Sequence, residues 1–319
     1  MILSPEILAI LIVNSIFFLF ASIAFFLSIK IFLYWDMEAT TKRQYELERE
    51  SFLVSTIIKY IFIIKIPLFL FFIFTLDKIS NLITGAMCAV GVVNATEYGI
   101  YLLIIKLINI YIFGLWLTIH YLDIKKTNLP YTKVKFEFFI IAYIFFVIEV
   151  ILMWLMFSSL DIDKMVSCCG TLFSSASSST IGDIIRIKTS IILSIFYGTT
   201  ILMVILYKYR VKYLFALINL IFLIISLISL ISFFGTYIYE LPTHHCPFCY
   251  LQSDYYYIGY LIYILLFLGS FYGFRLGVME ILGERVESSY RYSLFFNILY
   301  VSVVTAYPIF YFIKNGVLL

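Results

Sequence analysis

Long apolar stretches decide the fold of this chain, and the clearest of them, residues 213–236, reads YLFALINLIFLIISLISLISFFGT. It contains no charged side chain. An α-helix rises about 1.5 Å per residue, so about 20 such residues cross the ~30 Å hydrocarbon core of a bilayer. The stretch therefore predicts a transmembrane helix.

Seven further stretches of the same kind surround it. With the first, the predicted spans are 7–34, 52–76, 99–121, 137–158, 189–207, 213–236, 250–274 and 292–313. The 319-residue chain is 63% hydrophobic and 13% charged, with a mean hydropathy of +1.05, which is far too apolar for a soluble domain. We predict an all-α integral membrane protein in which residues 1–319 form a single transmembrane domain, a polytopic bundle of about eight helices. The first six residues carry no basic side chain and no cleavage pattern follows, so the first span should be retained.

The basic residues predict the orientation of these helices. Of the 22 Lys and Arg residues, four lie within spans and 13 lie in the loops after the first, third, fifth and seventh spans, which leaves 5 on the opposite side. Because cytoplasmic loops carry the excess of positive charge, both termini should be extracytoplasmic. We expect a prokaryotic inner or plasma membrane, with lipid as the surrounding partner. The net charge of +3 is too small to indicate nucleic-acid binding.

All five cysteines fall in loops that this orientation places outside the cytoplasm. They are Cys88, Cys168, Cys169, Cys246 and Cys249. Thiols clustered on one face of a membrane favour either redox exchange or soft-metal binding.

The strongest local signal is the run His244-His245-Cys246-Pro247-Phe-Cys249. Proline is favoured as the first residue of a helix, which predicts that Cys246 is the N-cap of the seventh span. A helix N-terminus, and the two histidines when protonated, would favour the Cys246 thiolate. We therefore expect Cys246 to be an attacking thiol and Cys249 to close a disulfide behind it.

A CxxC at the mouth of a transmembrane helix resembles the quinone-linked thiol oxidases of the DsbB and vitamin K epoxide reductase type. The resemblance covers only the segment 240–249, and this chain has more spans than those families. It implies that Cys246 and Cys249 pass electrons to a quinone. It also implies that a second pair on an outer loop, here Cys168 and Cys169, exchanges with an extracytoplasmic thiol protein.

A polar and aromatic set near the same membrane face could hold the quinone head group. Its members are Lys106, Gln252, Asp254, Tyr256 and Tyr257. The simpler alternative is that they are interfacial belt residues, with a salt bridge between Lys106 and Asp254.

The cysteine loops also allow readings without electron transfer. His244, His245, Cys246 and Cys249, with Cys88, offer imidazole and thiolate ligands of the kind that bind zinc or copper. A structural disulfide framework is a further possibility, and so is a non-catalytic subunit that uses these loops for docking. No haem is expected, because CxxC is not followed by histidine. The sequence leaves the oligomeric state open.

Two charged residues lie deep inside predicted spans, Lys65 in the second and Glu149 in the fourth. Counted from the cytoplasmic side they are at similar depth. A lone charge at the bilayer centre costs at least ~2.5 kcal/mol, so each needs a partner. We predict that they form an ion pair, beside a kink at Pro67.

Overall fold

The structure, a computed structural model, describes residues 4–36, 38–86, 88–161, 166, 187–284 and 287–319. Helices account for 82% of these residues, and no strand occurs among them. Eight of the helical segments are long and apolar enough to cross a membrane. The prediction of an all-α chain with eight helices long and apolar enough to cross a membrane is confirmed for the described residues. The side on which each terminus lies stays a prediction.

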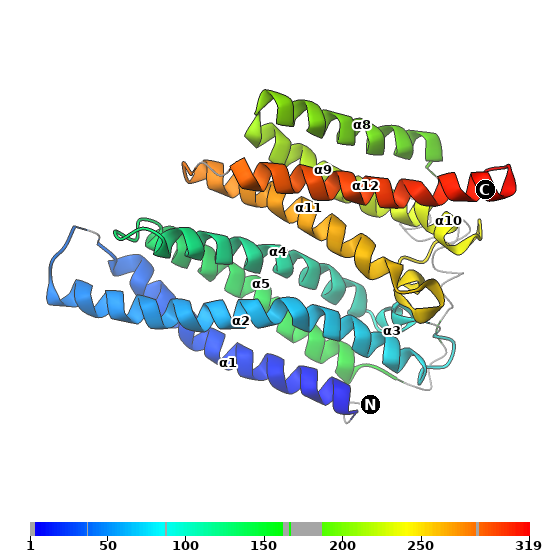
Figure 1. Cartoon of the computed structure of the whole chain (residues 1–319). Helices are drawn as coiled ribbons and strands as arrows, with labels where there is room; N and C mark the ends of the chain where they lie inside the picture. The colour runs from blue at the N-terminus through cyan, green and yellow to red at the C-terminus, as the bar shows by residue number, and fades with distance from the viewer. Residues whose placement is uncertain (1–3, 37, 87, 162–165, 167–186, 285–286) are drawn as a thin grey trace. The chain divides into compact units, whose positions relative to one another are not determined.

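The chain divides into two compact units, and unit 1 covers Met1–Val166. Its helices are α1 (Pro5–Tyr34), α2 (Lys42–Ser80), the short α3 (Ala89–Asn94), α4 (Gly99–Ile124) and α5 (Thr132–Ser158). The four long helices form a ring in which α1 packs on α2, α2 on α4, α4 on α5 and α5 on α1 (Figure 1). Short α3 lies between α2 and α4 and contacts both.

Aromatic side chains fill the interior of unit 1. Phe62 of α2 stacks on Phe113 of α4, with ring centroids 4.2 Å apart, and meets Trp116 edge-on at 5.4 Å. All three side chains are buried. Helix α2 begins well before its apolar stretch, because the hydroxyl of Thr41 accepts a hydrogen bond from the Gln44 backbone N–H and caps the helix.

Unit 2 covers Ser167–Leu319 and repeats the same cyclic order of helices. Its segments are α8 (Thr189–Tyr209), α9 (Lys212–Ser229), which continues through η1 (Leu230–Phe234) into α10 (Gly235–Tyr239), then α11 (Ile258–Ile281) and α12 (Glu287–Asn315). Helix α8 packs on α9, α9 on α11, α11 on α12 and α12 on α8. Figure 1 shows α11 and α12 running side by side. The prediction that the whole chain forms one transmembrane domain stays a prediction.

Small residues let the helices of unit 2 approach each other around a polar centre. The amide of Asn297 donates to the side-chain oxygen of Asn219 at 2.8 Å, and Asn219 donates to the backbone oxygen of Ser270 at 2.8 Å. A side chain at Gly269 would collide with Asn297, and one at Gly273 would collide with Asn219. These asparagines therefore tie α9, α11 and α12 together where only glycine fits.

Candidate functional site

The Cys246–Cys249 pair lies on the loop of unit 2 between α10 and α11. Lys314, near the end of α12, donates to Glu240 at the start of this loop, at 3.1 Å. The hydroxyl of Tyr237 reaches the backbone oxygen of Leu319 at 3.5 Å. Within unit 2 the pair therefore lies at the end of the helices that also carries the C-terminus.

The local structure differs from the expected helix start. Helix α11 begins at Ile258, and Cys249 instead opens a one-turn 3-10 helix, η2 (Cys249–Leu251). Tyr256 and Tyr257 both have left-handed backbone conformations, with φ of 54° and 56°, so no helix can run through them. The prediction that Cys246 caps the seventh span was wrong, and with it goes the stabilisation of its thiolate by a long helix.

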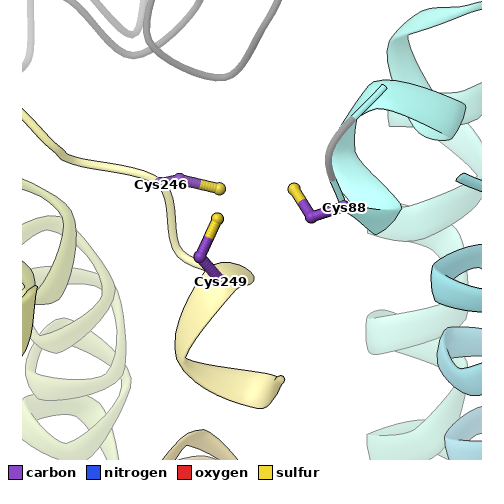
Figure 2. A group of neighbouring side chains, drawn as sticks. All are labelled: Cys88, Cys246 and Cys249. Atoms are coloured by element: carbon purple, nitrogen blue, oxygen red, sulfur yellow. The ribbon is translucent and has the colours of Figure 1, made fainter. Parts of the chain in front are cut away.

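The loop nevertheless brings the two thiols together. Their sulfur atoms lie within 4.8 Å of one another. Figure 2 shows the side chain of Cys249 pointing from the start of η2 back toward that of Cys246. Both side chains are buried, with 1% of Cys246 and 8% of Cys249 exposed. Cys249 is thus slightly the more accessible of the two, and the role of Cys246 as the attacking thiol stays a prediction.

The hydroxyl groups of three tyrosines, Tyr239, Tyr250 and Tyr263, form hydrogen bonds beside the pair that the sequence analysis missed. Tyr239 donates to the backbone oxygen of Cys246 and accepts from the Tyr250 N–H at 3.1 Å. Tyr263 donates to the backbone oxygen of Pro247 at 2.7 Å. A hydroxyl has only one proton, so the 2.7 Å contact between Tyr250 and Tyr263 has Tyr250 as donor. The density of tyrosine from 250 to 263 was the available signal.

A fourth tyrosine, Tyr255, packs edge-on against Tyr239 with ring centroids 4.8 Å apart. Burial raises the pKa of Tyr255, and negative charge at Cys249 and Asp254 raises it further. Burial also raises the pKa of Tyr250 well above its ordinary value. Both phenols therefore stay protonated at physiological pH, and that of Tyr250 donates its proton to Tyr263.

The ring nitrogens of the two histidines are not grouped with both sulfurs in the described residues. Nδ1 of His245 lies 2.9 Å from the backbone oxygen of Ile231, so it carries the proton and leaves Nε2 with the lone pair. His244 packs edge-on against Tyr239 with ring centroids 4.3 Å apart. In the described part of the chain, neither histidine places a ring nitrogen within 4.8 Å of both sulfurs. The expected ligand set is thus only partly assembled.

The remaining cysteines belong to other segments of the chain. Cys88 belongs to unit 1, where it is fully buried and precedes the first residue of α3, as drawn in Figure 2. Its role as a metal ligand stays a prediction. Cys168 and Cys169 lie outside the described residues, and so does any pairing between them.

The proposed quinone contacts are spread over both units. On the loop of unit 2, Gln252 is half-buried, while Asp254, Tyr256 and Tyr257 are exposed, Tyr256 to 92%. Lys106 belongs to unit 1, where it is buried and donates to Glu149 at 2.7 Å. Quinone binding by this set stays a prediction.

Unit 1 contains a second concentration of polar groups, and the predicted ion pair is part of it. Lys65 donates to Glu149 at 2.6 Å, which confirms the pairing. Two groups were missed: Lys106, which binds the same carboxylate oxygen, and Asn109, which donates to the other oxygen at 2.6 Å. Asn14 of α1 accepts from Lys65 at 2.7 Å. All four long helices of unit 1 meet at this cluster.

The chain matches no protein-family model, no curated protein and no solved structure. The two sites are therefore interpreted from their own residues.

Proposed function

We propose that this chain is an integral membrane protein of thiol–disulfide exchange, in which Cys246 and Cys249 are the working pair. The observation that carries the proposal is the approach of their sulfur atoms to within 4.8 Å in a CPFC turn. A disulfide forms only where two cysteine side chains already lie close together. Because this turn places them so, the pair can oxidise without a large backbone movement.

The reaction balances as three coupled two-electron steps. A substrate dithiol reduces a Cys168–Cys169 disulfide and leaves as a disulfide. The Cys168–Cys169 dithiol then re-forms its own disulfide and reduces the Cys246–Cys249 disulfide to two thiols. These thiols then reduce a membrane quinone to its quinol, and both protons and both electrons pass to the quinone oxygens. The proposed substrate is an extracytoplasmic thiol protein, which exchanges first with Cys168 and Cys169.

The hydroxyl groups of Tyr239 and Tyr263 support this role because they position the turn that carries the two cysteines. Hydrogen bonds to the backbone oxygens of Cys246 and Pro247 hold the turn from both sides. A turn held in this way keeps its two sulfurs at a constant separation. Both cysteines are covered by the protein itself, which limits their reaction with small oxidants in bulk solvent.

The orientation is part of the proposal. The distribution of Lys and Arg supports extracytoplasmic termini and cysteine loops. In intact cells, an impermeant maleimide added after mild reduction should label Cys168. Labelling that occurs only in inside-out vesicles would reverse the orientation.

Soft-metal binding is the second candidate, and the sulfur separation favours it as well. Two Zn–S bonds of about 2.3 Å in tetrahedral geometry hold their sulfurs about 3.8 Å apart, which lies inside the 4.8 Å limit on this pair. His245 adds support, because a histidine whose Nδ1 binds a backbone oxygen presents Nε2 as a ligand nitrogen.

One experiment separates the two functions. The full-length protein is purified with and without a soluble quinone, its cysteine pairings are mapped by mass spectrometry, and its copper and zinc contents are measured. The proposal expects a Cys246–Cys249 disulfide that forms with quinone and is lost in Cys246→Ser and Cys249→Ser. Cys88→Ser is the matched control and should leave that disulfide intact.

Other outcomes would overturn the redox proposal. Stoichiometric metal that falls together in Cys246→Ser and Cys249→Ser would establish the metal function instead. A pair that neither oxidises nor holds metal would point to a non-catalytic subunit.

A further inference from the structure

The polar cluster of unit 1 carries an excess of positive charge. It contains two ammonium groups, Lys65 and Lys106, and one carboxylate, Glu149. Their side chains are 3%, 5% and 2% exposed. Among the described residues, the neighbouring helix α1 contributes to this cluster the neutral Asn14. The cluster is thus a built polar site within apolar helices, and the ion pair uses only part of its hydrogen-bonding capacity.

Asn109 has an acceptor that the cluster leaves unused. Its Nδ2 donates to Glu149 at 2.6 Å and to the backbone oxygen of Phe145 at 3.3 Å, which fixes the orientation of the amide. Asn109 is 1% exposed, and its Oδ1 accepts no hydrogen bond from the residues that the structure describes. A buried amide oxygen without a donor costs about 1–3 kcal/mol, so a donor is expected there.

Lys106 has donors to spare beside that acceptor. Its ammonium donates to Glu149 at 2.7 Å and lies 4.6 Å from the ring centroid of Phe72. An ammonium has three N–H groups. Within the described residues, these two contacts use no more than two of them.

A cavity of about 10 Å³ connects these groups. Its polar side is formed by Lys65, Lys106, Asn109 and Glu149. The apolar side is formed by Leu68, Phe69, Ile110 and Phe113. A volume of this size holds about one oxygen atom with its hydrogens. The cavity is not fully enclosed, so the ring of a phenol or the chain of an alcohol would lie outside it, against the half-buried side chains of Leu68 and Phe69.

We propose that this cavity binds a single hydroxyl oxygen, supplied either by water or by a membrane-soluble phenol or alcohol. The oxygen accepts a hydrogen bond from Lys106, and its proton is donated to Oδ1 of Asn109. A halide would balance the excess charge, but it would face the Asn109 oxygen and offer it no proton. The proposal is independent of the cysteine chemistry.

The first arm of the test uses phenol as the probe on the purified full-length protein. Phenol should raise the melting temperature in a saturable way, whereas toluene, which has the same ring without the hydroxyl, should not. Asn109→Leu and Lys106→Met should abolish the shift. Lys78→Met is the matched control, because Lys78 is exposed and pairs with Glu6 elsewhere in the unit.

The second arm detects water by radiolytic hydroxyl-radical labelling. Phe113 lines the cavity and Phe139 does not, although each is 1% exposed. Bound water should make Phe113 label several-fold faster than Phe139. This comparison needs no substituted protein, so it holds even if a variant fails to fold.

Either arm alone supports the site and identifies the source of the hydroxyl. Stabilisation by sodium bromide at constant ionic strength, with no effect of phenol and equal labelling of the two rings, would make it an anion site and overturn the proposal. The absence of all three effects would also overturn it.

Discussion

Replacing Glu149 with leucine is the most informative perturbation of unit 1. Glu149 is the single carboxylate on which two ammonium groups and one amide converge, at 2.6–2.7 Å. The change would leave Lys65 and Lys106 buried side by side without a counter-ion. Removing one partner of a buried ion pair costs about 3–5 kcal/mol, and we expect Glu149→Leu to reach at least that range.

The structure predicts a different result for each lysine. Lys106→Met loses one hydrogen bond to a charged group, about 1.5–3 kcal/mol, but leaves a balanced pair of Lys65 and Glu149. Lys65→Met with Glu149→Leu should recover only part of the loss, because Lys106 remains uncompensated. Adding Lys106→Met to that double variant should recover most of it, since apolar replacement of a whole buried charge cluster is often near neutral.

The assay is denaturant unfolding of the purified protein in detergent micelles, followed by circular dichroism. Lys78→Met serves as the control and should change stability little, because its ion pair with Glu6 is exposed. If Glu149→Leu proves no more damaging than Lys106→Met, then Glu149 is not the shared counter-ion and the reasoning fails.

Two further substitutions test unit 2. Tyr263→Phe removes the hydroxyl that donates to the backbone oxygen of Pro247, so alkylation of the cysteine pair should become faster. Tyr272 lies farther along α11, so Tyr272→Phe is the control and should leave the alkylation rate unchanged. Equal rates in the two variants would refute the positioning role. Gly273→Ala should cost about 1–3 kcal/mol in thermal unfolding, because its methyl group would collide with Asn219. Gly198→Ala, where nothing lies within 4 Å, should be neutral or slightly stabilising, and a similar loss in both would refute the packing argument.

The positions of the long apolar stretches were sufficient to predict the eight spans, because any helix that crosses a membrane needs about 20 apolar residues in a row. The start of the seventh span was predicted at residue 250, but the helix begins at Ile258. Hydropathy reports which residues suit lipid and not which backbone conformations they adopt. The left-handed conformations of Tyr256 and Tyr257 therefore had no counterpart in the apolar pattern.

The candidate sites were predicted in part. Depth along the helices was enough to pair Lys65 with Glu149. The same reasoning grouped Lys106 with Asp254, whereas Lys106 pairs with Glu149. Lys106 and Asn109 are three residues apart and so share a face of α4, which was the missed indication that they act on one partner. The spacing of Cys246 and Cys249 predicted their proximity, whereas the hydrogen bonds of Tyr239 and Tyr263 to the backbone of this turn form only in the folded chain.

The order of the charged residues along the chain has a consequence for biosynthesis. Lys65 and Lys106 precede Glu149, so a growing chain exposes both ammonium groups to the insertion machinery before their counter-ion has been made. Each would cost about 2.5–3.5 kcal/mol if released alone into lipid. Helices α2 and α4 should therefore be retained at the site of insertion until α5 is synthesised. A nascent chain truncated before Glu149 should integrate poorly.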